Sequence, residues 1–373
     1  MTAQAPSPDS RRPAAAPSRC SDQPSDAPDP ADVPAAQKAE EPESGASRAS
    51  RPAKADVPAA RAGEHPAEED GKVVAARDEA VRPVRGTAAG LRYVALPPTA
   101  VDARASGPTR LVLAWPGFDP PRTAAAMATA VPMTGVPTWR VYLDLPHADD
   151  AAAALPTGLD SQGLLTEAGI TAFGTAVEGA AALLPDVLAD LRRDLGVPAD
   201  PVALAGFSAG AAVVLLALAR QDVQVSTAAL VAPVVSPARV ARSVEKRSGR
   251  ERSWSPAATE LAERLDLSAQ AGRIAESGAA LLLIGGARDR IVPGTQVTAL
   301  RDLLARCGAP AVEAAAFRMG HALAAAPGVE ARPPITEAVR VDGVLTDWFR
   351  ERLAEPGPRP APPVALHLTG TST

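Results

Sequence analysis

The chain has 373 residues, of which 46% are hydrophobic and 3% aromatic, with 39 prolines and a formal net charge of −5 at pH 7. This length can hold one large domain or two small ones. The charges form no basic stripe, and because phosphate binding needs clustered lysines and arginines, nucleic acid is not expected as a partner.

Neither a membrane span nor an export signal is expected. No run of apolar residues approaches a length of about 18. Arg11 and Arg12 are followed by residues 13–18, which do not form the apolar segment of a twin-arginine signal. The two cysteines, Cys20 and Cys307, indicate no disulfide framework and fit a reducing compartment. We therefore expect a cytoplasmic protein.

Composition separates two terminal segments from a central domain. Residues 1–86 are rich in Ala, Pro, Ser and charged residues and hold almost no Leu, Ile, Phe or Tyr, which predicts a disordered tail. Such a tail is a tether, an interaction element or a dispensable extension. Residues 354–373 are a second disordered, Pro-rich tail. Residues 87–353 between them have the length of one α/β domain.

Strands and helices alternate through the central domain. Strands are expected at 91–96 (an edge strand), 109–115, 139–145, 202–205, 227–232, 279–284 and 312–317. Helices are expected at 174–195, 209–222, 294–306 and 336–352. Pro185 should kink or split the first of these helices. The alternation predicts a mostly parallel sheet with helices on both faces and ligands bound at the carboxyl ends of the strands.

Residues 236–277 interrupt this alternation. The segment is too long for an ordinary connection, and it carries a run of charges followed by a helical pattern. We expect a small helical insertion over the strand ends, which either forms part of a substrate pocket or is a solvated excursion.

The sequence Gly206-Phe207-Ser208-Ala209-Gly210 joins a buried strand to an Ala-rich helix. A Gly-x-Ser-x-Gly pattern in this setting predicts a sharp turn that exposes the serine hydroxyl as a nucleophile. Gly206 and Gly210 remove side chains that would clash there, and the helix N-terminus favours developing negative charge. The alternative is a chance match in an Ala- and Gly-rich chain.

A serine nucleophile needs a base, and the base needs a third group that orients it. Of the four histidines, His65 and His367 lie in the tails and His147 precedes Ser208, which leaves His321, just after the last strand. Asp289 follows the strand at 279–284 and is the expected acid. The alternatives are that His321 is an ordinary loop histidine and that Asp289 pairs with Arg288 or Arg290 on the surface. Asp266 and Asp302 lie in helical patterns, and we expect both to be solvated.

Two backbone N–H groups are expected to bind the oxyanion. One belongs to Ala209, the residue after the nucleophile. The other is expected from Phe118, in the loop after the strand at 109–115, although Trp115 and Phe118 can also be plain core residues.

These three motifs, at Gly206–Gly210, Gly285–Pro293 and Gly320–His321, resemble those of the α/β-hydrolase superfamily, in particular esterases and the dienelactone-hydrolase-like or prolyl-oligopeptidase-like catalytic domains. The resemblance covers roughly residues 90–353. It implies an α/β-hydrolase fold with a Ser-Asp-His triad. The chain has Pro116-Gly117 where these families usually carry His-Gly, and a serine where dienelactone hydrolases carry cysteine.

We therefore expect a serine hydrolase that cleaves a small carboxylic ester through an acyl-enzyme on Ser208, with no metal and no cofactor. Three alternatives remain. The same triad serves a thioesterase or acyltransferase, or a peptidase, and the fold can also be a non-catalytic binding module. The oligomeric state does not follow from the sequence.

Overall fold

The computed structural model describes residues 82–99, 105, 107–147 and 160–354. The two predicted tails lie almost entirely outside these residues. Their inner ends are described, and the first strand, Val84–Ala88, begins within the segment that we had assigned to the N-terminal tail. This strand forms because Ala89 and Gly90 both have positive φ (46° and 80°), the backbone of a tight hairpin turn that returns the chain into the next strand.

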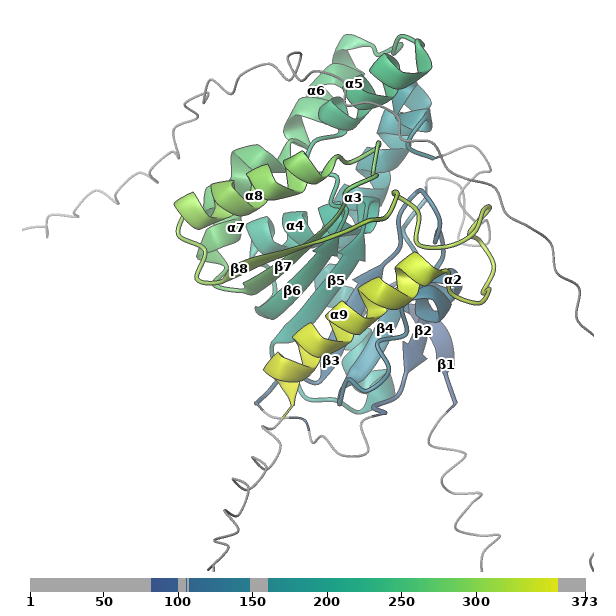
Figure 1. Ribbon diagram of the computed structural model, residues 1–373. Helices are drawn as coiled ribbons and strands as arrows, with labels where there is room; N and C mark the ends of the chain where they lie inside the picture. Colours follow the sequence, from purple (N-terminus) through teal and green to yellow (C-terminus); the bar gives the residue numbers. More distant parts are fainter. Residues whose placement is uncertain (1–81, 100–104, 106, 148–159, 355–373) are drawn as a thin grey trace, which may run out of the picture. The chain divides into compact units, whose positions relative to one another are not determined.

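The sheet has eight strands in the order β1-β2-β4-β3-β5-β6-β7-β8 (Figure 1). β1 and β2 are antiparallel to their neighbours, whereas β3 to β8 are parallel. The strands are β1 Val84–Ala88, β2 Leu91–Leu96, β3 Leu111–Trp115, β4 Trp139–Leu143, β5 Val202–Phe207, β6 Val225–Val231, β7 Ala280–Gly286 and β8 Val312–Phe317. The mostly parallel sheet is confirmed, but β2 is not the edge strand, because β1 pairs along its outer side.

Helices cover both faces of the sheet, as predicted. α2 (Ala124–Ala130) and α9 (Thr336–Leu353) lie on one face, and α3 (Glu167–Leu195), α4 (Ala209–Arg220) and α8 (Gly294–Arg306) lie on the other (Figure 1). The four central strands are almost wholly apolar and buried, as strands covered on both sides must be.

Helix α3 runs without a break through Pro185, so the expectation of a split helix is wrong. It is also the one helix among the described residues that is long and apolar enough to cross a membrane, which our count of apolar runs had not indicated. Half of its most apolar window is buried within the fold, where α3 packs on α4. A long core helix meets the same criteria of length and composition as a membrane span.

The segment after β6 is helical, as expected. It comprises α5 (Pro237–Ser248), α6 (Pro256–Arg264), the 3-10 turn η2 (Leu267–Gln270) and α7 (Ala271–Glu276). The indole Nε1 of Trp254 donates to the carbonyl of Leu164 at 2.9 Å, and the amide of Ser253 donates to the carbonyl of Leu165 at 2.8 Å. These bonds anchor the insertion to the short 3-10 turn η1 (Gly163–Leu165) ahead of α3, so it is a packed part of the domain.

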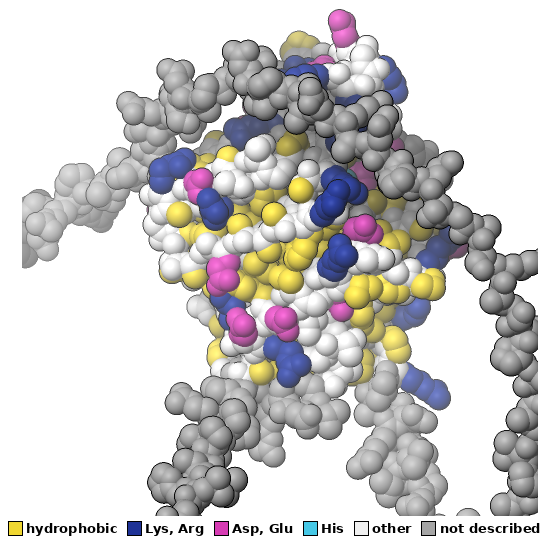
Figure 2. All heavy atoms as spheres, in the orientation of Figure 1, with side chains coloured by type: hydrophobic (Ala, Val, Ile, Leu, Met, Phe, Trp, Pro, Cys, Tyr) yellow, Lys and Arg dark blue, Asp and Glu magenta, His cyan; other side chains and the backbone are white. Residues whose placement is uncertain are grey.

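The far edge of the sheet is β8, a six-residue strand with alanines at its centre. Figure 2 shows hydrophobic surface between α8 and α9, over this end of the sheet. Glu313 of β8 forms an ion pair with Arg352 of α9 at 2.9 Å. A charge on an edge strand disfavours pairing with another chain. Cys307, just after α8, is disulfide-bonded, so the expectation that the cysteines form no disulfide is wrong for this residue.

A buried hydrogen-bond chain fixes α9 on the sheet, and Thr227 of β6 is its centre. The Thr227 hydroxyl accepts from Nε1 of Trp348 at 2.9 Å and donates to the carbonyl of Ala280 at 2.9 Å. We predict that Thr227→Val lowers the free energy of unfolding by about 1–3 kcal/mol, because the indole N–H loses its buried partner. Urea unfolding measures this change. Thr298→Val, at an exposed site on α8, is the control and should stay within about 0.5 kcal/mol. Equal stability of both variants would contradict the assignment.

Candidate active site

The carboxyl end of β5 runs into α4 through a single strained residue, Ser208. Its backbone has φ 55° and ψ −113°, outside the regions that residues with side chains normally adopt. Such strain costs on the order of 1–3 kcal/mol and persists only where the surroundings impose it. The N–H of Ser208 donates to the carbonyl of Val231 at 2.9 Å, and its carbonyl accepts from the amides of Ala211 and Ala212. The sharp turn that the pattern predicted is therefore present.

The two glycines of the turn sit where the backbone comes too close for a side chain. A Cβ on Gly206 would lie 2.3 Å from the carbonyl oxygen of Gly210, and a Cβ on Gly210 would lie 2.3 Å from that of Trp115. Neither glycine needs a positive φ, so close approach is the reason for both. The second contact presses the start of α4 against the loop after β3.

The structure brings Ser208, His321 and Asp289 together in one hydrogen-bonded row. Nε2 of His321 lies 2.9 Å from Oγ of Ser208, and Nδ1 lies 2.7 Å from Oδ2 of Asp289. The other carboxylate oxygen accepts from the amides of Ile291 and Val292 at 2.8 and 2.9 Å. A buried carboxylate on Nδ1 holds the proton there, which leaves Nε2 free to accept the serine proton.

Backbone contacts align the loops that carry Asp289 and His321. The amides of Ala287 and Arg288 donate to the carbonyls of Phe317 and Met319, at 2.8 and 3.0 Å. Gly286 permits this approach, since a Cβ there would lie 2.6 Å from the Met319 carbonyl oxygen. The two loops therefore extend the pairing of β7 with β8, which sets the histidine beside the aspartate.

The three candidate acids differ in their contacts. The Asp289 side chain is fully buried and bonds His321 and backbone amides rather than the neighbouring arginines. Asp302 lies on α8 and pairs with Arg301 at 2.7 Å. Asp266 caps η2. Neither Asp302 nor Asp266 belongs to the row of Ser208, His321 and Asp289, and their contacts agree with the expectation that both lie in helical segments away from it.

The other histidines stand apart from Ser208. His147 follows β4, and its pKa is lowered by burial, an effect that the nearby Asp144 carboxylate opposes. Within the described part of the chain, no contact joins it to Ser208. His65 and His367 lie outside the described residues. No cluster of three or more metal-ligating side chains occurs among the described residues.

The loop after β3 passes directly against the nucleophile. A Cβ on Gly117 would lie 2.8 Å from Cβ of Ser208, so only glycine lets the backbone approach this closely. The amide of Gly117 donates to the carbonyl of Pro121 at 3.1 Å and is thus engaged within the loop. The Phe118 ring is buried edge-on against Phe173, with ring centroids 5.9 Å apart. The ring therefore anchors the loop, and the oxyanion role of the Phe118 and Ala209 amides stays a prediction.

The sequence analysis missed one residue of the site, Asp119. Its Oδ2 lies 3.5 Å from Nε2 of His321, and Oδ1 contacts the amide and hydroxyl of Ser161 at 3.5 and 3.4 Å. Burial raises the pKa of Asp119, while His321 and Ser161 partly offset this and Asp160 adds to it. Its place directly after Phe118 was the available signal, because that loop was already expected to reach the nucleophile.

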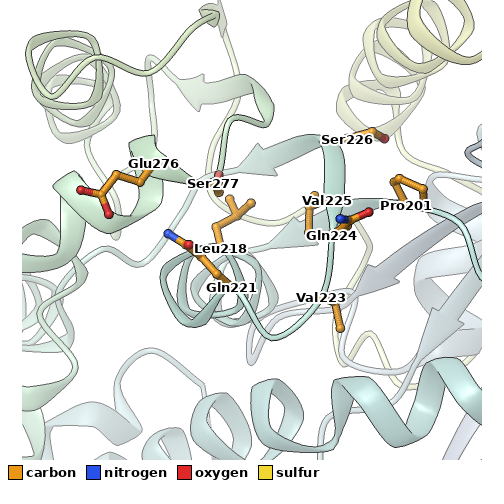
Figure 3. Close-up of a pocket in the computed structure, with 9 residues that line it drawn as sticks. All are labelled: Pro201, Leu218, Gln221, Val223, Gln224, Val225, Ser226, Glu276 and Ser277. Carbon is orange, nitrogen blue, oxygen red and sulfur yellow. The ribbon is translucent and has the colours of Figure 1, made fainter. Parts of the chain in front are cut away.

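A separate groove opens at the opposite ends of the strands (Figure 3). It has a volume of about 380 Å³ and is lined by residues that precede β5, end α4, begin β6 and end α7. Pro201 and Val225 belong to this lining, whereas Ser208 follows the carboxyl end of β5. The groove is thus remote from the row of Ser208, His321 and Asp289.

Solved structures resemble the overall fold of this chain at low sequence identity. Puromycin hydrolase aligns with a TM-score of 0.50 at 19% identity, covering 73% of this chain and 40% of that one. TT1662 from Thermus thermophilus aligns with a TM-score of 0.47 at 21% identity, over 72% of this chain and 98% of its own. The Pyrococcus furiosus esterase Pf2001 gives 0.45 at 14% identity, over 74% and 93%. No family model and no curated protein matches the sequence.

The class follows from the topology, the sharp turn after β5 and this likeness: the protein has the α/β-hydrolase fold. At these identities the likeness concerns the fold alone. The chain spans only about two fifths of the length of puromycin hydrolase.

The close approach at Gly210 yields a test of the turn. We predict that Gly210→Ala lowers the free energy of unfolding by about 2 kcal/mol or more and reduces any activity, because the new methyl group meets backbone that cannot move aside. Gly343→Ala is the matched control, since a Cβ on this exposed residue of α9 meets nothing within 4 Å. It should be neutral or stabilising by up to about 1 kcal/mol. Chemical unfolding compares the two, and an unaffected Gly210→Ala would refute the proposed crowding.

The raised pKa of Asp119 has a consequence for stability. A carboxyl whose folded pKa exceeds its unfolded value destabilises the fold once it ionises, so its cost appears as the pH rises through the window between the two values. Asp119→Asn removes the charge. We predict a higher melting temperature than wild type at pH 7, with the gain vanishing below about pH 3.5, where both states of the wild type are protonated. A variant that is less stable at pH 7 would contradict this.

Proposed function

We propose that the protein is a serine hydrolase that cleaves a small carboxylic ester through an acyl-enzyme on Ser208. The observation that carries the proposal is the buried row from Ser208 Oγ through both nitrogens of His321 to Asp289, at 2.9 and 2.7 Å. A serine on a strained turn, next to a base oriented by a carboxylate, is the arrangement that activates a hydroxyl for acyl transfer.

The first half of the reaction forms the acyl-enzyme. Ser208 Oγ attacks the acyl carbon as its proton passes to Nε2 of His321, and the Asp289 carboxylate stabilises the resulting imidazolium. The negative charge that develops on the carbonyl oxygen meets the N-terminus of α4, with the amides of Ala209 and Phe118 as donors. Nε2 then returns the proton to the leaving alcohol, and the bond between acyl carbon and leaving oxygen breaks.

Water completes the cycle. Nε2 removes a proton from a water molecule that attacks the acyl carbon, and Ser208 Oγ leaves with that proton while the carboxylic acid is released. These steps use only residues of this chain. A thioester or a peptide bond enters the same sequence with a different leaving group, and an acyltransferase would replace the water by another acceptor.

We infer that the substrate is a small molecule. Ser208, Asp289 and His321 are only 3–8% exposed. This burial favours a substrate with a compact acyl group over a macromolecule that would bind through a large surface. A non-catalytic binding role is disfavoured, because such a role needs neither the strained turn nor the aligned base and carboxylate.

The nucleophile is tested by Ser208→Ala. We predict that this change removes labelling by a fluorophosphonate probe and lowers kcat/KM for a short 4-nitrophenyl ester by about 10³-fold or more, because no other side chain replaces the attacking oxygen. Ser243→Ala on α5 is the control, since among the described residues its hydroxyl bonds the carbonyl of Arg239 within the helix. The control should keep both signals.

Two results would refute the proposal. Undiminished turnover or labelling in Ser208→Ala would place the nucleophile elsewhere. A folded wild-type protein that neither reacts with the probe nor turns over any ester, thioester or anilide would favour a binding module.

A further inference from the structure

Asp119 places a second carboxylate beside the catalytic histidine, on the side away from Asp289. Its Oδ2 is buried and has no hydrogen-bond partner among the described residues. Nε2 of His321 lies 3.5 Å away, and this contact is an ion pair only if the ring is protonated. An unpaired carboxylate oxygen in a buried site is costly, so its retention calls for a donor that arrives from elsewhere.

The position of this oxygen relates it to the leaving group. Nε2 must come within hydrogen-bond reach of the leaving atom in order to protonate it. Nε2 already contacts Ser208 Oγ at 2.9 Å, and Asp119 Oδ2 lies 3.5 Å from the same nitrogen. The leaving atom and Asp119 Oδ2 therefore share the space in front of Nε2.

We propose that Asp119 is a specificity-determining residue that accepts a hydrogen bond from a leaving group bearing an N–H, so that the site favours amide substrates over esters of the same acyl group. This inference rests on the Ser208 chemistry of the proposed function and changes its preferred substrate from an ester to an amide. A carboxylate can only accept a hydrogen bond, whereas an ester oxygen at the leaving position has no hydrogen to donate.

The chemistry balances with one proton moved. In the tetrahedral intermediate the leaving nitrogen carries one N–H, which donates to Asp119 Oδ2. Its lone pair takes the second proton from Nε2, the bond between carbon and nitrogen breaks, and the product departs as a neutral primary amine. The acyl group stays on Ser208, and the positive charge that develops on nitrogen is stabilised by the facing carboxylate.

Oδ1 of Asp119 gives the test a defined orientation. The amide N–H of Ser161 points at this oxygen, so Asp119→Asn should keep its carbonyl oxygen there and turn its NH₂ toward Nε2. The NH₂ group is a donor, so it cannot accept a hydrogen bond from the N–H of an amide leaving group. The substitution thus inverts the hydrogen-bonding character of one position with almost no change in volume.

The experiment compares three substrates with one short acyl group: the 4-nitrophenyl ester, the 4-nitroanilide and its N-methyl derivative. We expect Asp119→Asn to lower the anilide-to-ester ratio of kcat/KM by about tenfold or more, the value of a hydrogen bond to a charged group. The N-methyl anilide, which has no N–H, should follow the ester. Asp160→Asn removes a nearby negative charge that contributes to the field at Asp119, and it should leave the ratio within about twofold.

The outcomes separate this inference from the function beneath it. Four results would overturn the role of Asp119 while leaving a serine hydrolase in place. Three of them are an unchanged ratio in Asp119→Asn, an equal loss for the N-methyl anilide, and an equal effect of Asp160→Asn. The fourth is a wild type that cleaves the ester but not the anilide. Absence of all three activities together with absence of probe labelling contradicts the serine hydrolase itself.

Discussion

The strained backbone of Ser208 is the constraint on which the rest of the site depends. A residue with φ 55° is held there by hydrogen bonds to β6 and to the first turn of α4, and by two glycines that let β5, α4 and the loop after β3 approach within contact distance. The stability of the wide, buried parallel sheet offsets the strain. In return, the hydroxyl stands at the end of β5, at the N-terminus of α4, where negative charge is favoured.

The remaining parts of the site converge because parallel strands end at one edge. β3, β7 and β8 deliver the loops of Phe118, Asp289 and His321 to that edge, and backbone bonds tie these loops to one another. The amide of Leu323, just after His321, donates to the carbonyl of Pro120 in the loop after β3. The base and the proposed oxyanion loop are thereby coupled, which explains how a carboxylate from that loop, Asp119, comes to face the histidine.

Local patterns in the sequence predicted most of this arrangement. The apolar strands and the turn at Ser208 follow from short-range chemistry, and the candidates Asp289 and His321 follow from the chain order expected after such a turn. Asp119 did not, because its significance lies in a contact between residues about 200 positions apart. β1 was missed because its short run is mostly exposed, and Pro185 failed to split α3 because packing over 29 residues outweighs one lost hydrogen bond.

The proposed mechanism requires Ser208 to carry the acyl group during turnover. Acid quenching of the full-length protein during hydrolysis of a 4-nitrophenyl ester, followed by peptide mass spectrometry, tests it directly. We predict a peptide that contains Ser208 with the added mass of the acyl group, and no such peptide when the substrate is omitted. An acyl group on a different residue, or steady turnover with only unmodified Ser208, would contradict it.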